Sequence, residues 1–325
     1  MSEEDIVLVT QLPSDSWFEG FALRPNGKIL AARLDQPELY TFRAEDEDAT
    51  PELLHTFPSC TGLVNIDTVP GRQDEYVVLA ANLDLETASN TDNVLWHVAL
   101  SADDSSPPKA TKMCDVTGTG FAIGIVAISE RTFLIPDSHK SCIWQLDSET
   151  GTKTEFYADE TMKVATADHS TFGLNRIRVF DDFLYFTNTS AGFVGRIPIA
   201  MDRSNPAVGI RVTGPVQKVC DQLPHLDGLA ISKDQTHAYT ASYVDGQLLE
   251  LRVNPATGEG KMEVIVTSLD SPTGVELVYV DGKPKLYVVC CGEIDMAWIP
   301  KYDENPWAAM GDINSAISIT HEVAE

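Results

Sequence analysis

The feature of this sequence that most restricts its fold is a repeat of roughly fifty residues. Six times, a turn-rich approach leads into a short apolar segment of the kind that forms a β-strand. The segments are Trp17–Phe21, Gly62–Ile66, Phe121–Ile125, Phe172–Ile177, Leu226–Leu229 and Pro272–Val275. If Glu19, Leu63, Ala122, Asn175, Asp227 and Thr273 are equivalent, the steps are 44, 59, 53, 52 and 46 residues. This period is typical of the four-stranded blade of a β-propeller.

Short alternating runs separated by tight turns predict antiparallel strands within each repeat. In the first repeat, Phe21–Leu23 and Ile29–Ala32 flank the turn Pro25–Lys28, which is hairpin chemistry. The run Ile6–Thr10 resembles the outermost strands of other repeats, so we expect it to complete the last blade. The sequence therefore predicts an all-β, six-bladed propeller of four-stranded antiparallel blades. It predicts one domain over residues 1–325, with the ring closed by the N-terminal strand.

Composition excludes several kinds of partner. The chain has 49 acidic and 23 basic residues, a formal charge of −26, which disfavours nucleic acid and anionic membrane surfaces. No apolar run reaches the ~18 to 20 residues needed to span a bilayer, so no membrane insertion is expected. The acidic start Met1–Asp5 lacks the features of a signal peptide, which predicts a cytoplasmic protein, or a secreted one if a leader was trimmed. The oligomeric state is left open.

The six cysteines show no metal-binding spacing. They include no CxxC pair, so zinc is not indicated. We interpret them as small buried hydrophobic residues in a reducing compartment. An even number leaves disulfides open.

Three polar residues are predicted to converge on the axis of the ring. In a propeller, the loops that lead into the innermost strands share one face with the loops between the two middle strands. Glu19, Asn175 and Asp227 start three of the inner strands, and we expect them, with His139 and Tyr243, to supply the chemistry of a site. The residues predicted to bind substrate around them are Trp17, Phe18, Asn65, Phe121, Phe172, Asn188, His225 and Thr273.

Each of these residue types also has an ordinary structural explanation. Carboxylates and amides at strand starts often cap turns by binding backbone N–H groups. His139 is either a donor or proton shuttle, or a solvated loop histidine. Tyr243 either donates a hydrogen bond inward or lies on the rim as an amphipathic aromatic. The aromatic residues of the predicted wall serve equally well in packing between blades.

The residues at the strand starts resemble a known family. Glu19, the triplet Gly173-Leu174-Asn175 and the triplet Leu226-Asp227-Gly228 are similar to the corresponding positions of the SMP-30/gluconolactonase/luciferin-regenerating family. The resemblance implies that Glu19, Asn175 and Asp227 hold one divalent cation, calcium, magnesium or manganese, which oxygen ligands suit. It also implies a lactonase in which the metal polarises the ring carbonyl and activates water.

The third repeat departs from that family. Where the lactonases place polar residues, this chain has Gly120-Phe121-Ala122-Ile123-Gly124, without a sugar-binding donor or a general base. An apolar, aromatic mouth of this kind suits a hydrophobic polycyclic or terpenoid ligand. This profile resembles the fungal hetero-Diels–Alderases of tropolone–sesquiterpenoid biosynthesis within the same propellers. That resemblance implies the joining of a reactive quinone methide to a humulene-type alkene, mainly by orientation.

Three functions therefore follow from the sequence as alternatives. The preferred one is a biosynthetic pericyclase for apolar small-molecule substrates, with no cofactor expected. The second is a metal-dependent lactonase that uses one divalent cation. The third is a propeller that binds a ligand without catalysis, because fold does not determine function.

Overall fold

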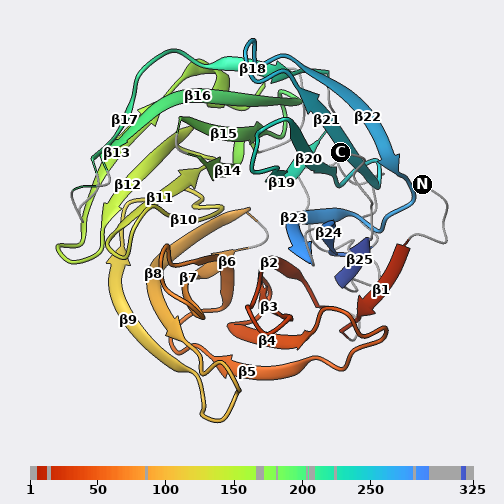
Figure 1. Cartoon of the computed structure of the whole chain (residues 1–325). Coiled ribbons are helices and arrows are strands. Elements are labelled where there is room, and N and C mark those ends of the chain that lie inside the picture. Colours follow the sequence, from red (N-terminus) through yellow and green to blue (C-terminus); the bar gives the residue numbers. More distant parts are fainter. Residues whose placement is uncertain are drawn as a thin grey trace.

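The strands of this protein are arranged in a ring around a central axis. The structure is a computed structural model that describes residues 6–12, 16–84, 87–165, 172–180, 182–202, 204, 209–222, 225–280, 283–292 and 316–319. Within them, six antiparallel sheets surround the axis as in a β-propeller (Figure 1). No helix in this part of the chain is long and apolar enough to cross a membrane. Residues 1–5, on which the prediction about a signal peptide rests, lie outside the described residues.

The first three sheets follow one another along the chain. The first contains β2 (Phe18–Leu23), β3 (Lys28–Arg33), β4 (Glu38–Arg43) and β5 (Glu52–Thr56). The second contains β6 (Gly62–Thr68), β7 (Glu75–Asp84), β8 (Ser89–Ala99) and β9 (Lys109–Val116). The third contains β10 (Val126–Ala127), β11 (Thr132–Asp137), β12 (Cys142–Asp147) and β13 (Thr152–Ala158). A 3₁₀ turn, η2 (Glu160–Met162), follows β13.

The other three sheets complete the ring. The fourth contains β14 (Leu174–Val179), β15 (Phe183–Asn188), β16 (Phe193–Asp202), β17 (Gly209–Val212) and β18 (Gln217–Cys220). The fifth contains β19 (Leu226–Ile231), β20 (His237–Ser242), β21 (Gln247–Val253) and β22 (Gly260–Val266). The last contains β23 (Pro272–Val280), β24 (Lys283–Cys290), β25 (Ala316–Ile319) and β1 (Ile6–Thr10).

The prediction of six four-stranded blades is wrong. Among the described residues, five sheets have four strands, and the fourth sheet has five. The reason is the length of β16, which offers its edge to two partners. Its first part, Val194–Arg196, pairs with β18, and its last part, Ile199–Asp202, pairs with β17. The outermost position of this sheet is therefore shared by two short strands.

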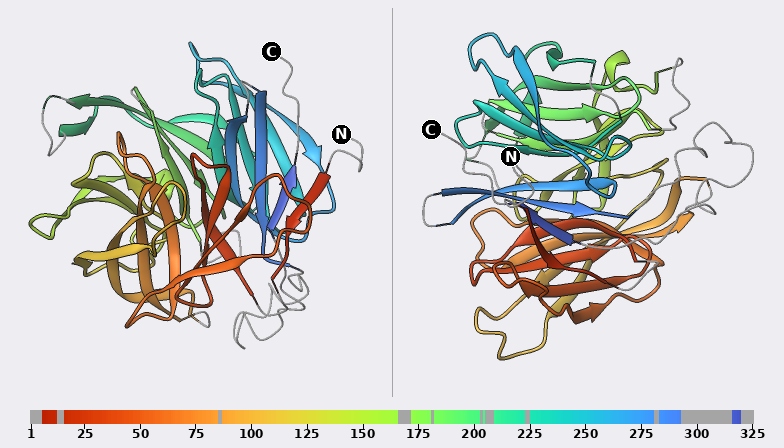
Figure 2. Two further views of the ribbon diagram at one scale, coloured as in Figure 1. Left: turned by 60° about the horizontal axis from the view of Figure 1, so that its bottom comes forward. Right: turned by 90° about the vertical axis from the view of Figure 1, so that its right-hand side faces the viewer.

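The two ends of the chain meet in the last sheet. β1 pairs antiparallel with β25, so the N-terminal strand takes the outermost place in a sheet otherwise built from the C-terminal part of the chain. Figure 2 shows these two strands side by side from both directions. This pairing agrees with the expectation that Ile6–Thr10 completes the last blade, and it covers an edge that would otherwise be exposed.

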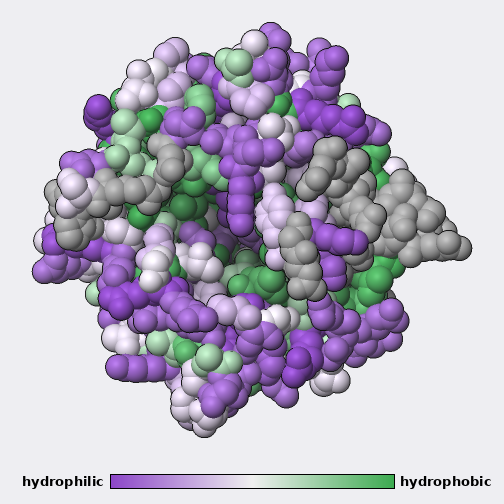
Figure 3. Space-filling model, in the orientation of Figure 1, coloured by the Kyte–Doolittle hydropathy of each residue, from purple (hydrophilic) through white to green (hydrophobic). Residues whose placement is uncertain are grey.

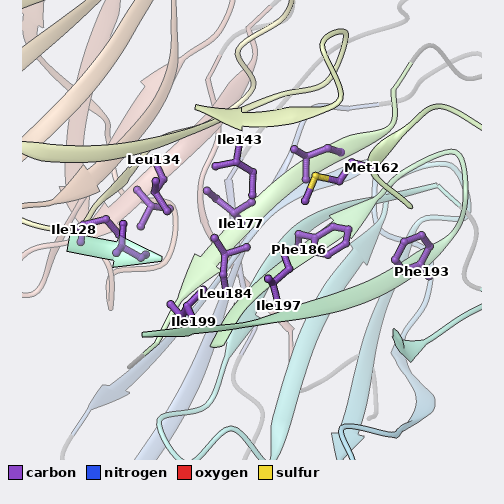
Figure 4. Packing of buried hydrophobic residues seen from close by; sticks show 13 residues of the cluster. Ile128, Leu134, Ile143, Met162, Ile177, Leu184, Phe186, Phe193, Ile197 and Ile199 are labelled. Carbon is purple, nitrogen blue, oxygen red and sulfur yellow. The ribbon is translucent and has the colours of Figure 1, made fainter. Parts of the chain in front are cut away.

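The hydrophobic core is divided among the contacts between neighbouring sheets. Six clusters of buried hydrophobic residues each bring together two sheets. In Figure 4, Leu134 and Ile143 of the third sheet face Ile177 and Phe186 of the fourth. Because both faces of a middle strand are covered, Val77–Ala81 in β7 is buried without interruption. This packing fixes the inner strands around the axis.

The face of the ring in Figure 3 is hollowed at its centre. Hydrophobic and hydrophilic surfaces both border the hollow, while hydrophilic residues cover most of the outer part of this face.

Candidate functional site

The starts of the inner strands share an irregularity that turns side chains toward the axis. Among the described strands, five of the six innermost have a shift of register there, between the residue pairs Phe18/Gly20, Leu63/Asn65, Leu174/Ile177, Leu226/Leu229 and Pro272/Gly274. A bulge of this kind inserts a residue and re-aims the side chains around it. Glu19, Asn175, Asp227 and Thr273 lie at these shifts. In β6 the inserted residue is Val64, so the alignment of Leu63 with Glu19 is wrong by one position.

Arg176 lies between the two predicted carboxylates. Its Nη2 donates a hydrogen bond to Oε1 of Glu19, and its Nε lies 3.7 Å from Oδ1 of Asp227. Its Nη1 donates to the carbonyl oxygen of Ile123 over 2.5 Å. The second oxygen of Glu19 accepts from the indole Nε1 of Trp17 over 2.8 Å. The structure therefore brings Glu19 and Asp227 together through an arginine that is buried like them.

The sequence-based prediction missed Arg176. Strict alternation along a strand places neighbours such as Asn175 and Arg176 on opposite faces. The register shift between Leu174 and Ile177 breaks that alternation, so Asn175 and Arg176 both contribute to the site. The only signal in the sequence is an arginine directly after the predicted asparagine.

Thr187 of β15 and Thr189, which follows the end of that strand, hold the starts of β14 and β19 together. Thr189 Oγ1 accepts from Asn175 Nδ2 over 3.0 Å and donates to the carbonyl of Leu226 over 2.7 Å. Thr187 Oγ1 accepts from the backbone N–H of Arg176 over 3.0 Å and donates to the carbonyl of Asp227 over 3.1 Å. Both threonines are fully buried. These bonds fix the backbone that carries Asn175, Arg176 and Asp227.

Three buried oxygen atoms of the site have no hydrogen-bond partner among the described residues. They are Oδ1 of Asn175, Oδ1 of Asp227 and Oγ1 of Thr273. The three residues are only 2%, 8% and 2% exposed, respectively. Leaving a buried polar atom unsatisfied costs about 1–3 kcal/mol. Buried atoms left unsatisfied in this way indicate a bound polar ligand or ordered water.

Burial controls the protonation of this cluster. It raises the pKa of Asp227 well above its ordinary value, and the charge of Glu19 adds to the effect. Arg176 and a hydrogen bond from Asn175 oppose it. Burial also raises the pKa of Cys291, again with a contribution from Glu19 and Asp227. Burial therefore favours the neutral form of Asp227, and Glu19 accepts a hydrogen bond from Arg176.

The predicted divalent-cation site does not fit this arrangement. Glu19, Asn175 and Asp227 do supply oxygen atoms, the ligands that such cations prefer. However, the guanidinium of Arg176 lies among them and already binds Glu19. A divalent cation here would lie next to a fixed positive charge and compete with it for the same carboxylate. Among the described residues, no three His, Cys, Asp or Glu side chains converge as a metal site either.

The third sheet contributes an aromatic group to the region. The ring centroids of Phe121 and Phe172 lie 5.6 Å apart, and those of His139 and Phe121 also lie 5.6 Å apart. Burial lowers the pKa of His139, so the neutral imidazole is favoured beside these rings. Phe121 is two residues before Ile123, whose carbonyl binds Arg176. The aromatic group is thus close in the chain to the polar cluster.

Two polar side chains fix the backbone under Phe121. The fully buried carboxylate of Asp137 accepts hydrogen bonds from the N–H groups of Gly120 and Phe121, over 2.8 and 2.9 Å. The amide of Asn90 binds both the N–H and the carbonyl of Ala122, over 3.1 and 2.6 Å. The sequence-based prediction did not include Asn90, which no local pattern connects with a residue 32 positions later.

His225 and Tyr243 lie together at the start of the fifth sheet. Their rings are 6.0 Å apart, and the N–H of Tyr243 donates to the carbonyl of His225 over 3.4 Å. His225 has φ +48, an uncommon backbone conformation for a residue with a side chain. Both residues are partly exposed, His225 directly before the start of β19 and Tyr243 directly after the end of β20.

Three residues predicted to bind substrate have other surroundings. Phe18 is 1% exposed and packs against Phe42 between the first and last sheets. Asn188 is fully buried, and its amide binds the carbonyls of Thr161 and Lys163 over 2.8 and 2.9 Å. Asn65 lines the axis, but its Oδ1 accepts from the next backbone N–H, that of Ile66.

A second layer of charges lies farther along the axis. Arg178, two residues after Arg176 on β14, donates to Glu276 of β23. Burial raises the pKa of Glu276 to about 7, although Arg178 opposes the rise. Arg176, Arg178, Glu276 and Glu19 line one small cavity between the two layers. The inner strands approach closely here, since a Cβ on Gly274 would lie 2.9 Å from the carbonyl of Glu19.

Comparison with known proteins supports the fold. No protein-family model matches the chain, and no curated protein matches its sequence. Among solved structures, it resembles the PQQ-bound aldose sugar dehydrogenase of Streptomyces coelicolor, with a TM-score of 0.59 and 10% identity over 96% of both chains. It also resembles regucalcin, a calcium-binding protein of Agrobacterium tumefaciens strain C58, with a TM-score of 0.56, 13% identity and coverage of 98% and 97%.

A protein of different function shares the architecture as well. A chain in the nidogen/laminin complex matches with a TM-score of 0.56 and 12% identity, over 82% of this chain and 86% of that one. At such identities the likeness establishes the β-propeller fold. The functions of these proteins do not transfer to this chain on that basis.

Proposed function

We propose that this protein is an enzyme that joins two apolar reactants in a cycloaddition, a (hetero-)Diels–Alderase-type pericyclase. Its substrates would be a terpenoid alkene and a reactive quinone methide, such as one derived from a tropolone. The observation that carries the proposal is the set of three buried oxygens without partners, on Asn175, Asp227 and Thr273, together with the aromatic pair of Phe121 and Phe172, whose second ring lies three residues before Asn175. This combination suits a largely apolar ligand with one polar end.

The polar end of a quinone methide matches these groups. Its carbonyl oxygen accepts a hydrogen bond, and Asp227 in its neutral form has a proton to donate. A neighbouring hydroxyl of the substrate would donate to Oδ1 of Asn175, whose amide nitrogen is already occupied by Thr189. A donor on the carbonyl makes the heterodiene more electron-poor, and the bond is strongest when charge develops on that oxygen.

The reaction requires little from the protein beyond this. In a hetero-Diels–Alder reaction one C–C and one C–O σ bond form together as two π bonds of the alkene and the heterodiene are consumed, and no proton, water or electron is gained or lost. The rate gain comes from holding both reactants in a reactive geometry, which contributes roughly 7 to 11 kcal/mol in favourable cases. Phe121 and Phe172 supply flat apolar surface for this purpose, and the fixed backbone under Phe121 limits the orientations available.

A metal-dependent lactonase is the second candidate. The observation in its favour is the convergence of Glu19, Asn175 and Asp227, the residues that the family resemblance selects. Arg176 counts against it, since its guanidinium takes the place that the cation would need. The third candidate, a protein that binds a ligand without catalysis, would use the same unsatisfied oxygens. It would differ in that it accelerates neither the cycloaddition nor lactone hydrolysis.

The test is a cycloaddition assay with purified protein. An ortho-quinone methide is released in situ from a stable precursor in the presence of humulene, and the adduct is measured by chiral chromatography with and without EDTA. We expect adduct formation above the uncatalysed rate, enrichment of one stereoisomer, and no effect of EDTA. A background rate with a racemic product would contradict the proposal. Lactone hydrolysis that EDTA abolishes would support the second candidate instead.

A further inference from the structure

The guanidinium of Arg176 is bordered by oxygen atoms of the kind that bind hard cations. We propose that the guanidinium of Arg176 acts as a built-in cation that fills a latent site for a hard divalent cation such as Ca²⁺ or Mn²⁺. The wild-type protein would then exclude these ions. Removing the positive charge at this single position would let one of them bind. The inference concerns cation binding and does not depend on the proposed reaction.

Three oxygens from three inner segments lie around the guanidinium, and a fourth belongs to the residue before Arg176 in the chain. Oε1 of Glu19 and the carbonyl of Ile123 accept its hydrogen bonds, and Oδ1 of Asp227 lies 3.7 Å from its Nε. Oδ1 of Asn175, on the adjoining residue, has no hydrogen-bond partner among the described residues. Two carboxylates, an amide and a backbone carbonyl are a ligand set that Ca²⁺ uses, with waters completing its coordination.

These oxygens are held by bonds that do not involve Arg176. Trp17 fixes the other oxygen of Glu19, and Thr189 fixes the amide of Asn175. Thr187 binds the backbone carbonyl of Asp227. Shortening the arginine side chain therefore removes the charge and leaves the oxygens in place. Such pre-positioned ligands favour binding because little ordering is needed when the ion arrives.

Charge balance favours the exchange. With Arg176 present, one fixed positive charge faces the carboxyl groups of Glu19 and Asp227, and both are nearly buried. Without it, ionisation of both groups would place two like charges in a poorly solvated space with no cation, which is costly. A divalent cation would remove that cost. In the wild type, the ion would instead meet the arginine at short range.

The experiment compares Arg176→Ala with Arg176→Lys and Arg178→Ala. Arg176→Lys keeps a positive charge at the position, and Arg178→Ala removes an axial arginine from the second layer while keeping Arg176. Binding of Mn²⁺ is followed by electron paramagnetic resonance and binding of Ca²⁺ by titration calorimetry. We expect Arg176→Ala to bind about one ion, at least about tenfold more tightly than the wild type and both controls. Its melting temperature should rise with added Ca²⁺.

Three outcomes would overturn the proposal. One is a folded Arg176→Ala protein, judged by circular dichroism, that binds Mn²⁺ no better than the wild type. Another is stoichiometric binding by the wild type that is lost in Asp227→Ala. The third is equal binding in Arg176→Ala and in Arg176→Ala combined with Glu19→Gln, which would place the ion elsewhere. If Arg176→Ala does not fold without Ca²⁺, folding on its addition supports the proposal. If it folds under neither condition, Arg176→Gln decides by the same criteria.

Discussion

The third sheet differs from the fourth and fifth sheets in which side chains hold the inner strand and which remain available to a ligand. Each must hold the start of an inner strand near the axis and also present something to a ligand. At the third sheet, the side chains of Asp137 and of Asn90 from the neighbouring second sheet hold the backbone, and the apolar Phe121 remains for contact. In the fourth and fifth sheets, Thr187 and Thr189 hold the backbone, and Oδ1 of Asn175 and Oδ1 of Asp227 remain without hydrogen bonds.

This difference shows why polarity in the sequence is a poor guide to the site. Asp137 is as buried and as polar as Asn175, yet its carboxylate is fully used by backbone and indole N–H groups. A ligand-binding group is distinguished by donors or acceptors that remain free after all hydrogen bonds within the protein have formed. The comparison thus predicts large losses of stability when a residue that holds the backbone is replaced. It predicts losses of activity when a residue that remains available to the ligand is replaced.

The largest effect is expected for Asp137→Ala. The carboxylate accepts bonds from the N–H groups of Gly120, Phe121 and Lys140 and from the indole of Trp144, over 2.8 to 3.0 Å. Removing it leaves buried donors unsatisfied, so we expect a loss of about 3 kcal/mol or more, measured by urea unfolding. Asp147→Ala, on the same sheet but with a partly exposed carboxylate, should cost much less. Equal losses of stability in Asp137→Ala and Asp147→Ala would contradict the structural role assigned to Asp137.

Asp227→Ala should leave the fold intact and reduce the cycloaddition. Loss of one preorganised donor to a developing oxyanion typically costs about 10²-fold in rate. Asp227→Asn should retain most of the activity, because an amide can still donate a hydrogen bond. The wild type should lose rate as pH rises through the raised pKa of Asp227, since ionisation removes the proton it donates. Asp227→Asn should not show that loss. Equal inactivity of both variants would instead favour a carboxylate ligand of a metal.

The sequence predicted the class of fold because its information is local and repeated. Turn residues, alternation and the recurring strand starts are all visible within one repeat, and they predicted antiparallel sheets around an axis. The prediction that every blade has four strands failed at one sheet. Whether β16 takes one outer partner or two depends on its length of ten residues and on pairing with distant segments. No repeat pattern encodes that choice.

The site was predicted less completely for a related reason. Glu19 and Asp227 were found because they start strands, but Arg176 reaches the axis only through a bulge. Phe18 has the same residue type as Phe121 and a similar position in its repeat, yet it packs between sheets. Which face a residue takes at a bulge depends on pairing with the next strand. This is a tertiary property that residue type does not report.

Phe121 and Phe18 can be separated by matched substitutions to leucine. Phe121→Leu removes the ring that stacks near Phe172 and His139, so we expect lower stereoselectivity and about tenfold slower cycloaddition, with stability little changed. Phe18→Leu should instead lower the free energy of unfolding by about 1 kcal/mol and leave selectivity unchanged. The measurements are chiral product analysis and urea unfolding of each variant. A loss of selectivity with Phe18→Leu alone would reverse the assignment.

The smallest expected effect is a pH-dependent change in stability at the second layer of axial charges, where Arg178 of β14 pairs with Glu276. The pKa of Glu276 is raised from 4.5 to about 7, chiefly by burial. The folded state therefore holds this proton more tightly than the unfolded state does. As pH rises above about 4.5, the unfolded carboxyl ionises first, so the wild type should lose stability relative to Glu276→Gln until pH passes about 7. Urea unfolding of both proteins at several pH values from 4.5 to 8 measures this difference. A difference that stays constant with pH would show that Glu276 ionises with the same pKa in the folded and unfolded states, and would contradict the prediction.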